Sequence, residues 1–162
     1  MRPMRYTAIL LLGLTACSAP PPELPSPPPG FPELNAFNPV DRNDFKVAGP
    51  SFVTAEQVDC RLDRGSTRSV ICDGDIAGFP NDIPGDGCPV ARKPDGAPDD
   101  TPYVLTRWDH PCTSARSMPI STGKKLVGDN STCVVGKNNL VACIDADHKH
   151  GFVLQPSGSW TF

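Results

Sequence analysis

Short runs of strand-forming residues, separated by turn residues, recur along the chain from residue 51 to its end. The runs are rich in β-branched and aromatic side chains, and Gly, Asp, Asn or Ser residues stand between them. They cover residues 51–54, 57–62, 68–72, 103–106, 126–127, 132–135, 140–144, 151–154 and 159–162. No window shows the 3.6-residue periodicity of an amphipathic helix. The pattern predicts an all-β domain over residues 51–162, organised as a small, disulfide-stapled antiparallel sheet or a barrel-like fold.

Residues 74–101 break this pattern. The segment contains five glycines, five prolines and six aspartates, which are residues of turns and irregular backbone. We therefore predict a long irregular loop between the strands at residues 68–72 and 103–106.

The first 16 residues carry a different pattern. Arg2 and Arg5 precede a short apolar run that ends in small residues. Such a segment predicts a secretory signal peptide over residues 1–16, and its apolar run is far shorter than the about 20 residues of a membrane-spanning helix. Residues 14–17, Leu-Thr-Ala-Cys, resemble a bacterial lipobox, in which the sulfur of Cys17 takes a diacylglycerol. The alternative is ordinary secretion with Cys17 left as a spare thiol.

A proline-rich stretch follows the predicted lipidation site. Residues 20–32 contain eight prolines, which exclude helix and sheet interior and favour extended polyproline II. We predict that residues 17–33 form a lipidated, proline-rich stalk and that residues 34–50 form an irregular strap. A proline-rich recognition motif is the alternative use of the stretch. On this interpretation the domain is anchored to the extracytoplasmic face of the cell membrane through its N-terminal lipid.

The charge balance bears on possible partners. The chain has 15 basic and 18 acidic residues, a net charge of −3 at pH 7. Because residues 1–16 hold two of the basic residues and none of the acidic ones, the mature chain carries a net charge of −5. The sequence contains no basic stripe, so nucleic acid is not an expected partner.

The cysteines constrain the fold most strongly. The chain has seven of them, and if Cys17 is acylated an even set of six remains. An even set in an exported chain predicts disulfides, because the compartment is oxidising. Structural metal sites favour Cys-x-x-Cys pairs or Cys/His clusters, and the spacing here provides neither.

Hairpin geometry suggests how these cysteines pair, although composition alone leaves the connectivity open. A hairpin about Asn138 places Cys133 directly opposite Cys143, and a hairpin about Ser66 places Cys60 opposite Cys72. Opposed residues in an antiparallel pair lie within disulfide range. The predicted disulfides are therefore Cys60–Cys72, Cys133–Cys143 and, from the remaining two cysteines, Cys88–Cys112.

The cysteine order resembles that of a group of small exported actinobacterial lipoproteins, of mycobacterial type. A strand from Phe52 leads to the first of the six cysteines, and residues 150–152 and 159–162 close the chain as His-Gly-Phe and Ser-Trp-Thr-Phe. The group closes with a similar Gly-His-Gly-Phe segment, in which Lys149 here replaces the first glycine. The resemblance covers residues 50–162 and implies export. It implies no activity, ligand or catalytic residue, because the group is functionally uncharacterised.

Two sets of residues could hold a metal, and neither completes a motif. His148 and His150 lie on one side of an extended segment near Asp145 and Asp147, and imidazoles are common transition-metal ligands. Residues 73–84 begin like a calcium loop but have Ala and Pro where an oxygen ligand and the bidentate Glu belong. A looser oxygen cage for calcium could draw its ligands from Asp82, Asp86, Asp95, Asp99 or Asp100. Exposed polar residues are the commoner outcome for both sets, so we predict no metal and no cofactor.

Catalytic motifs are also incomplete. The chain has no Gly-x-Ser-x-Gly elbow, and His110 stands beside a proline and Cys112, which fits a turn. Trp108 could mark a binding face at a loop edge, whereas Trp160 and Phe162 are expected to close the core. We predict no catalytic residue.

These features predict a cell-envelope lipoprotein with a non-catalytic binding or structural role. The expected partner is an envelope protein, glycan or lipid. The alternative is an inhibitor of, or a hydrolase acting on, cell-wall material: a pocket joining histidines and acids would favour a hydrolase, and a protruding loop at residues 74–101 would favour an inhibitor.

Overall fold

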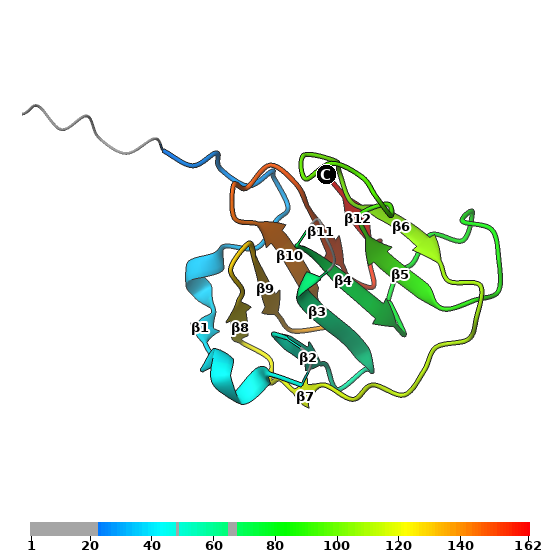
Figure 1. Ribbon diagram of the computed structural model, residues 1–162, viewed down its shortest axis with the longest axis horizontal. Coiled ribbons are helices and arrows are strands. Elements are labelled where there is room, and N and C mark those ends of the chain that lie inside the picture. The colour runs from blue at the N-terminus through cyan, green and yellow to red at the C-terminus, as the bar shows by residue number, and fades with distance from the viewer. Residues whose placement is uncertain (1–22, 48, 65–67) are drawn as a thin grey trace, which may run out of the picture.

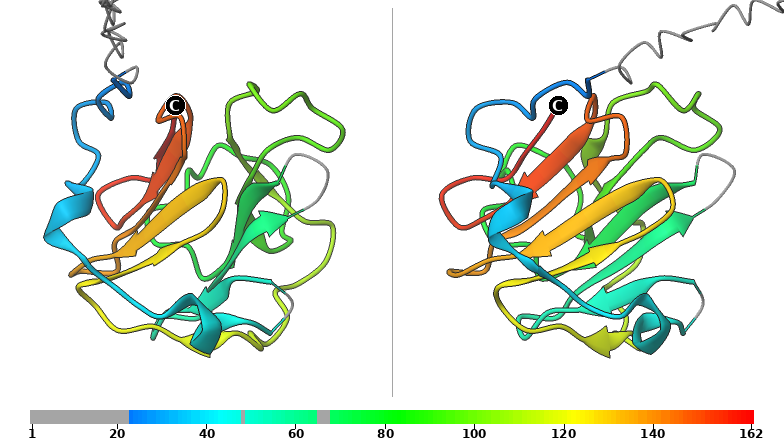
Figure 2. Two further views of the ribbon diagram at one scale, coloured as in Figure 1. Left: turned by 60° about the vertical axis from the view of Figure 1, so that its left-hand side comes forward. Right: turned by 90° about the vertical axis from the view of Figure 1, so that its left-hand side faces the viewer.

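The described residues of the computed structural model, 23–47, 49–64 and 68–162, form two six-stranded sheets packed face to face (Figure 1, Figure 2). The first sheet has the order β1-β8-β9-β10-β11-β12, and the second has the order β6-β5-β4-β3-β2-β7. In chain order the elements are η1 (Leu34–Ala36), β1 (Asn38–Pro39), η2 (Arg42–Phe45), β2 (Ser51–Val53), β3 (Val58–Arg64), β4 (Ser69–Gly74), β5 (Pro89–Arg92), β6 (Val104–Arg107), β7 (Met118–Pro119), β8 (Lys124–Val127), β9 (Ser131–Val135), β10 (Val141–Asp145), β11 (Gly151–Leu154) and β12 (Trp160–Thr161). The predicted signal peptide and Cys17 lie outside the described residues.

The all-β class is confirmed, and its finer description needs two corrections. Within the described residues neither sheet closes on itself, so the barrel-like alternative does not hold. The sheets are mixed rather than purely antiparallel, because β1 pairs with β8 and β2 pairs with β7 in parallel. Both of these two-residue edge strands end in a proline, Pro39 or Pro119. Proline cannot donate a hydrogen bond to a ladder, which confines such strands to sheet edges.

The two hairpins that carry cysteines have the predicted register. Cys133 lies opposite Cys143 in β9–β10, and Cys60 lies opposite Cys72 in β3–β4. In both pairs the Cα atoms are 4.1 Å apart and the sulfurs are at disulfide distance. At the β9–β10 turn Asn138 and Asn139 have φ values of 56° and 58°, the left-handed conformation that asparagine tolerates. The third pair, Cys88 and Cys112, also lies at disulfide distance.

The two hairpin disulfides meet at the centre of the molecule. Sγ of Cys72, in the second sheet, lies 3.9 Å from Sγ of Cys143, in the first sheet. All four cysteines of these disulfides are fully buried. Phe52 of the second sheet and Phe152 of the first are buried in the same cluster. The core between the sheets is therefore built around two contacting disulfides.

The N-terminal segment covers the outer face of the first sheet. Phe31, Leu34 and Phe37 pack on the buried outward side chains of β9, β10 and β11. The Phe31 ring also meets Phe162 edge to face, with centroids 5.7 Å apart. Residues 34–50, expected to be irregular, contain η1, β1 and η2. The end of the proline-rich stretch therefore packs on the domain instead of extending freely from it.

The prediction of an irregular loop at residues 74–101 is wrong in part. Strand β5 lies inside this segment and pairs with both β4 and β6. Its four residues begin with Pro89, and proline is a poor strand signal in a sequence. Ile76 is buried and Phe79 packs against the core. Strand β5, Ile76 and Phe79 are thus part of the sandwich, whereas residues 94–101 contain no strand and are mostly exposed.

Candidate functional site

The outer face of the second sheet is polar because of strand alternation. In β3, Val58, Cys60 and Leu62 point into the core, so Asp59 and Arg61 point outward. Ser51 of β2 lies opposite Arg61, and Asp73 of β4 lies opposite Asp59. Three neighbouring strands thus contribute polar side chains to one surface.

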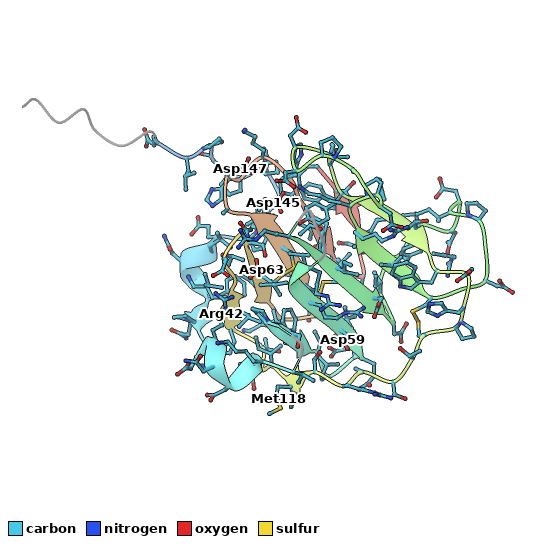
Figure 3. The ribbon with its side chains drawn as sticks, in the orientation of Figure 1. Arg42, Asp59, Asp63, Met118, Asp145 and Asp147 are labelled. Atoms are coloured by element: carbon cyan, nitrogen blue, oxygen red, sulfur yellow. A yellow bond between two sulfur atoms is a disulfide. The ribbon has the colours of Figure 1, made fainter. Side chains whose placement is uncertain are left out.

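This surface contains a groove of about 550 Å³. It is lined by Val47, Ser51, Asp59, Arg61, Thr113, Ser114, Arg116 and Ser117. One wall is the strand pair β2–β3, and the other is the chain that leads into β7. The volume lies within the usual range for small-ligand sites. Figure 3 shows Asp59 and Met118, the first residue of β7, toward the same end of the molecule.

The loop that forms the second wall is held at both ends. The Cys88–Cys112 disulfide fixes its start to the residue before β5. At its other end, Ser117 Oγ donates a hydrogen bond to Asp59 Oδ1 over 2.7 Å. Because both ends are fixed, the groove keeps its width without support from a ligand.

A chain of polar contacts orients Arg61 at the groove. Arg61 donates a hydrogen bond to Asp73 Oδ2, which also accepts from Trp108 Nε1 over 3.3 Å. The Trp108 ring contacts the guanidinium of Arg92, 4.7 Å from the ring centroid, and stacks on His110. Trp108 is therefore already engaged inside the protein, and it serves to position Asp73 and, through it, Arg61.

Glycine at position 87 permits this arrangement. A Cβ atom at Gly87 would lie 1.8 Å from the carbonyl oxygen of Trp108. Only glycine lets the chain before Cys88 approach the Trp108 backbone so closely.

Several hydrogen-bonding groups at the groove are unsatisfied. The Ser51 side chain is buried, with the residue 3% exposed, and its Oγ has no hydrogen-bond partner among the described residues. Arg61 Nε is likewise buried without a partner within that part of the chain. Buried polar groups are normally paired, so each exception calls for an explanation. Arg116 is exposed at the rim.

A second polar cluster lies at one end of the core, between the sheets. Asp145 of β10 accepts a hydrogen bond from the Tyr103 hydroxyl over 2.6 Å and pairs with Lys93 Nζ at 2.8 Å. The Tyr103 hydroxyl in turn accepts from the Val70 amide. Burial raises the pKa of Tyr103, and the charge of Asp145 raises it further. These contacts satisfy each member of the cluster.

This cluster fits a structural role better than a catalytic one. The Lys93 side chain is 3% exposed and held by Asp145, so its ammonium is not a free nucleophile. The adjoining cavity, lined in part by Asp99, Asn130 and Asp147, measures only about 190 Å³. We interpret the Lys93–Asp145–Tyr103 cluster as a structural polar network that links the two sheets.

A third polar cluster joins β3 to the turn after β8. Asp63 has a φ of 56° at a register shift in β3, and its carboxylate accepts from the backbone amides of Asp129 and Asn130. Arg42 of η2 pairs with both Asp63 and Asp129, and Figure 3 shows Arg42 beside Asp63. The hydrogen bond from Arg42 lowers the pKa of Asp129. Sequence reasoning missed this cluster, because nothing local in β3 signals the bulge that turns Asp63.

His148, His150, Asp145 and Asp147, considered as a metal site, do not bring their ligand atoms together. His148 Nδ1 lies 3.1 Å from the carbonyl oxygen of Pro25, and Asp145 is engaged by Tyr103 and Lys93. Asp147 caps the Lys149 amide. His150 Nδ1 is buried and has no hydrogen-bond partner within the described part of the chain.

The other candidates also lie apart. Among the described residues, the one group with three potential metal ligands within 4.8 Å of one another is Cys60, Cys72 and Cys143, whose sulfurs lie at disulfide distance in their pairs. His110 stacks on Trp108 and is exposed, with Nδ1 2.9 Å from the carbonyl oxygen of Pro111. Trp160 and Phe162 lie on the outer face of the first sheet, with Phe31, rather than between the sheets.

Comparisons with protein-family models, curated proteins and solved structures give no match for this chain. In the part of the chain that the structure describes, no helix has the length and apolar character to cross a bilayer.

The raised pKa of Tyr103 predicts a loss of stability at alkaline pH. The unfolded chain releases a tyrosine proton near a pKa of about 10, whereas the folded state retains it. The contribution of Tyr103 to the free energy of unfolding is thus complete below about pH 10 and falls by about 1.4 kcal/mol per pH unit above it. Urea unfolding at a series of alkaline pH values measures this slope.

Tyr103→Phe is the matched control for this titration. The variant lacks the tyrosine part of the slope, so the stability difference from wild type shrinks as the pH rises. At neutral pH we expect it to be less stable by about 1–3 kcal/mol, because the Val70 amide and Asp145 lose a partner. Release of the Tyr103 proton from the folded protein near pH 10, seen as phenolate absorbance, would contradict this account.

Proposed function

We propose that this protein is a lipid-anchored lipoprotein of the cell envelope whose β domain binds an envelope ligand, without catalysis, in the groove beside β2 and β3. The single observation that carries the binding role is the groove itself, with a buried Ser51 hydroxyl at its wall that lacks a partner among the described residues.

Two features support the export and anchoring part of the proposal. Residues 1–17 have the composition of a signal peptide that ends in a lipobox. The six other cysteines form three pairs at disulfide distance, which suits an oxidising compartment. The resemblance to exported actinobacterial lipoproteins agrees with both features.

The position of the groove suits a domain anchored by its N-terminus. The start of the described chain, drawn in blue, lies at one end of the molecule near the loop between β10 and β11, and β2 and β7 lie at the other end (Figure 1, Figure 2). His148 of that loop contacts Pro25. The described part of the chain therefore begins at the end of the domain remote from β2 and β7.

The chemistry of the groove favours binding over turnover. Its lining offers hydroxyls, two guanidinium groups and one carboxylate, with no imidazole or thiol among the described lining residues. Asp59, the carboxylate, already accepts a hydrogen bond from Ser117. The inhibitor alternative would rest on the exposed irregular stretch at residues 94–101, since β5 lies within the sheet.

The lipid anchor predicts a specific modification. In membranes of cells that express the full chain, we expect the N-terminal peptide to begin at Cys17 and to carry a diacylglycerol on its sulfur. Mass spectrometry of that peptide measures the modification, and Ser18→Ala, next to the acylated residue, should leave it intact. A mature N-terminus elsewhere, or a free thiol at residue 17, would contradict the anchor.

The binding role predicts that blocking the groove removes binding to envelope material. For this test the mature chain carries Cys17→Ser, so that it stays in solution. Ser114→Trp places a large side chain in the groove and should weaken co-sedimentation with isolated cell walls at least about tenfold. Ser157→Trp adds the same side chain at an exposed turn outside the groove and should bind like the parent chain. Equal binding by both tryptophan variants, or no binding by the parent chain, would refute the proposed role.

A further inference from the structure

We infer that the groove takes an acidic glycan, a segment of sugar chain that carries a carboxylate. The inference deepens the proposed function and rests on the groove being the binding site. It is argued from the hydrogen-bonding groups and charges that line the groove.

Most polar groups that line the groove are hydroxyls. Ser51, Thr113, Ser114 and Ser117 each bring an O–H that both donates and accepts. Sugar hydroxyls have the same dual character, so a glycan satisfies such a lining in many orientations. Ser51 Oγ, although it is covered by its neighbours, also lacks a partner in the described chain.

Charge adds a requirement for an anion. Of the charged groups here, Asp59 is engaged by Ser117, and Asp73 is engaged by Arg61 and Trp108. The guanidinium groups offer donors to a ligand: the Arg61 side chain is 34% exposed although its Nη2 is held by Asp73, and Arg116 is exposed at the rim. An arginine fork matches the planar geometry of a carboxylate and strengthens its hydrogen bonds through charge. Free donors therefore exceed free acceptors.

The neighbouring acids favour a carboxylate over a phosphate. Asp59 lines the groove itself, and Asp73 lies directly behind Arg61. Lys46, which precedes the lining residue Val47, donates to Asn43. Two guanidinium groups and one carboxylate line the groove, a net charge of +1, which suits a singly charged carboxylate better than a phosphate, whose charge approaches −2. The net charge of −3 for the whole chain points away from a polyanion such as nucleic acid.

A calorimetric titration with defined probes tests the ligand class. The probes are trigalacturonate, which carries carboxylates, the neutral trisaccharide maltotriose, and inorganic phosphate, each added to the mature chain with Cys17→Ser. We expect trigalacturonate to bind at least about tenfold more tightly than maltotriose, and its affinity to fall with added salt. Phosphate should not displace it at equal concentration.

Variants locate this binding in the groove. Arg116→Gln should weaken trigalacturonate binding about tenfold and lower the preference for trigalacturonate over maltotriose by a similar factor, because the contact to the carboxylate is lost. Lys137→Gln removes the same charge at the distant β9–β10 turn and should have no effect. Heteronuclear NMR spectra confirm that both variants are folded and place the shifted amides in β2, β3 and residues 113–117.

Different results would reject the acidic-glycan inference and the proposed binding function. Equal affinity for both trisaccharides, displacement by phosphate, or no effect of Arg116→Gln would overturn the acidic-glycan assignment. If Ser114→Trp still abolished binding to cell walls, the binding role would stand with another ligand. If the parent chain bound neither cell walls nor trigalacturonate, both would fall.

Discussion

The contact between two buried disulfides is the constraint on which the rest of this structure depends. Each disulfide links directly opposed residues of one hairpin, and the sulfurs of Cys72 and Cys143 bring the hairpins of the two sheets together at 3.9 Å. Aromatic residues make up only 7% of the chain, so few large side chains are available to fill the space between the sheets. Four fully buried sulfurs fill its centre, and the covalent bonds limit the freedom of the unfolded chain.

The outer faces follow from this arrangement. Because Cys60 points inward, its neighbours Asp59 and Arg61 must point outward, and the groove begins with them. The third disulfide, Cys88–Cys112, lies away from this contact and holds the loop that forms the second wall of the groove. On the first sheet the N-terminal segment occupies the corresponding face. One face is thus occupied by the chain itself and the other is left open, which is why the proposed ligand site lies on the second sheet.

Much of this architecture was predictable from local signals, and the remainder was not. Strand alternation and the two asparagines of the β9–β10 turn fix the cysteine register within a few residues, and the structure confirms that register. Strands β1, β5 and β7 were missed, since each contains a proline and is paired through distant partners. The candidate site was missed for a related reason. Ser51, Arg61 and Arg116 are unremarkable polar residues in sequence, and only the sheet order brings them to one groove.

The most direct test of the central claim is the order in which the disulfides open under a thiol reductant, followed by alkylation and mass spectrometry of the cysteine peptides. Cys112 is exposed, so the account predicts that Cys88–Cys112 is reduced first while the domain stays folded. Cys60–Cys72 and Cys133–Cys143 should then open together, at the rate of global unfolding, because their sulfurs are buried against one another. Reduction of either core disulfide alone, in a domain that keeps both sheets folded, would contradict it.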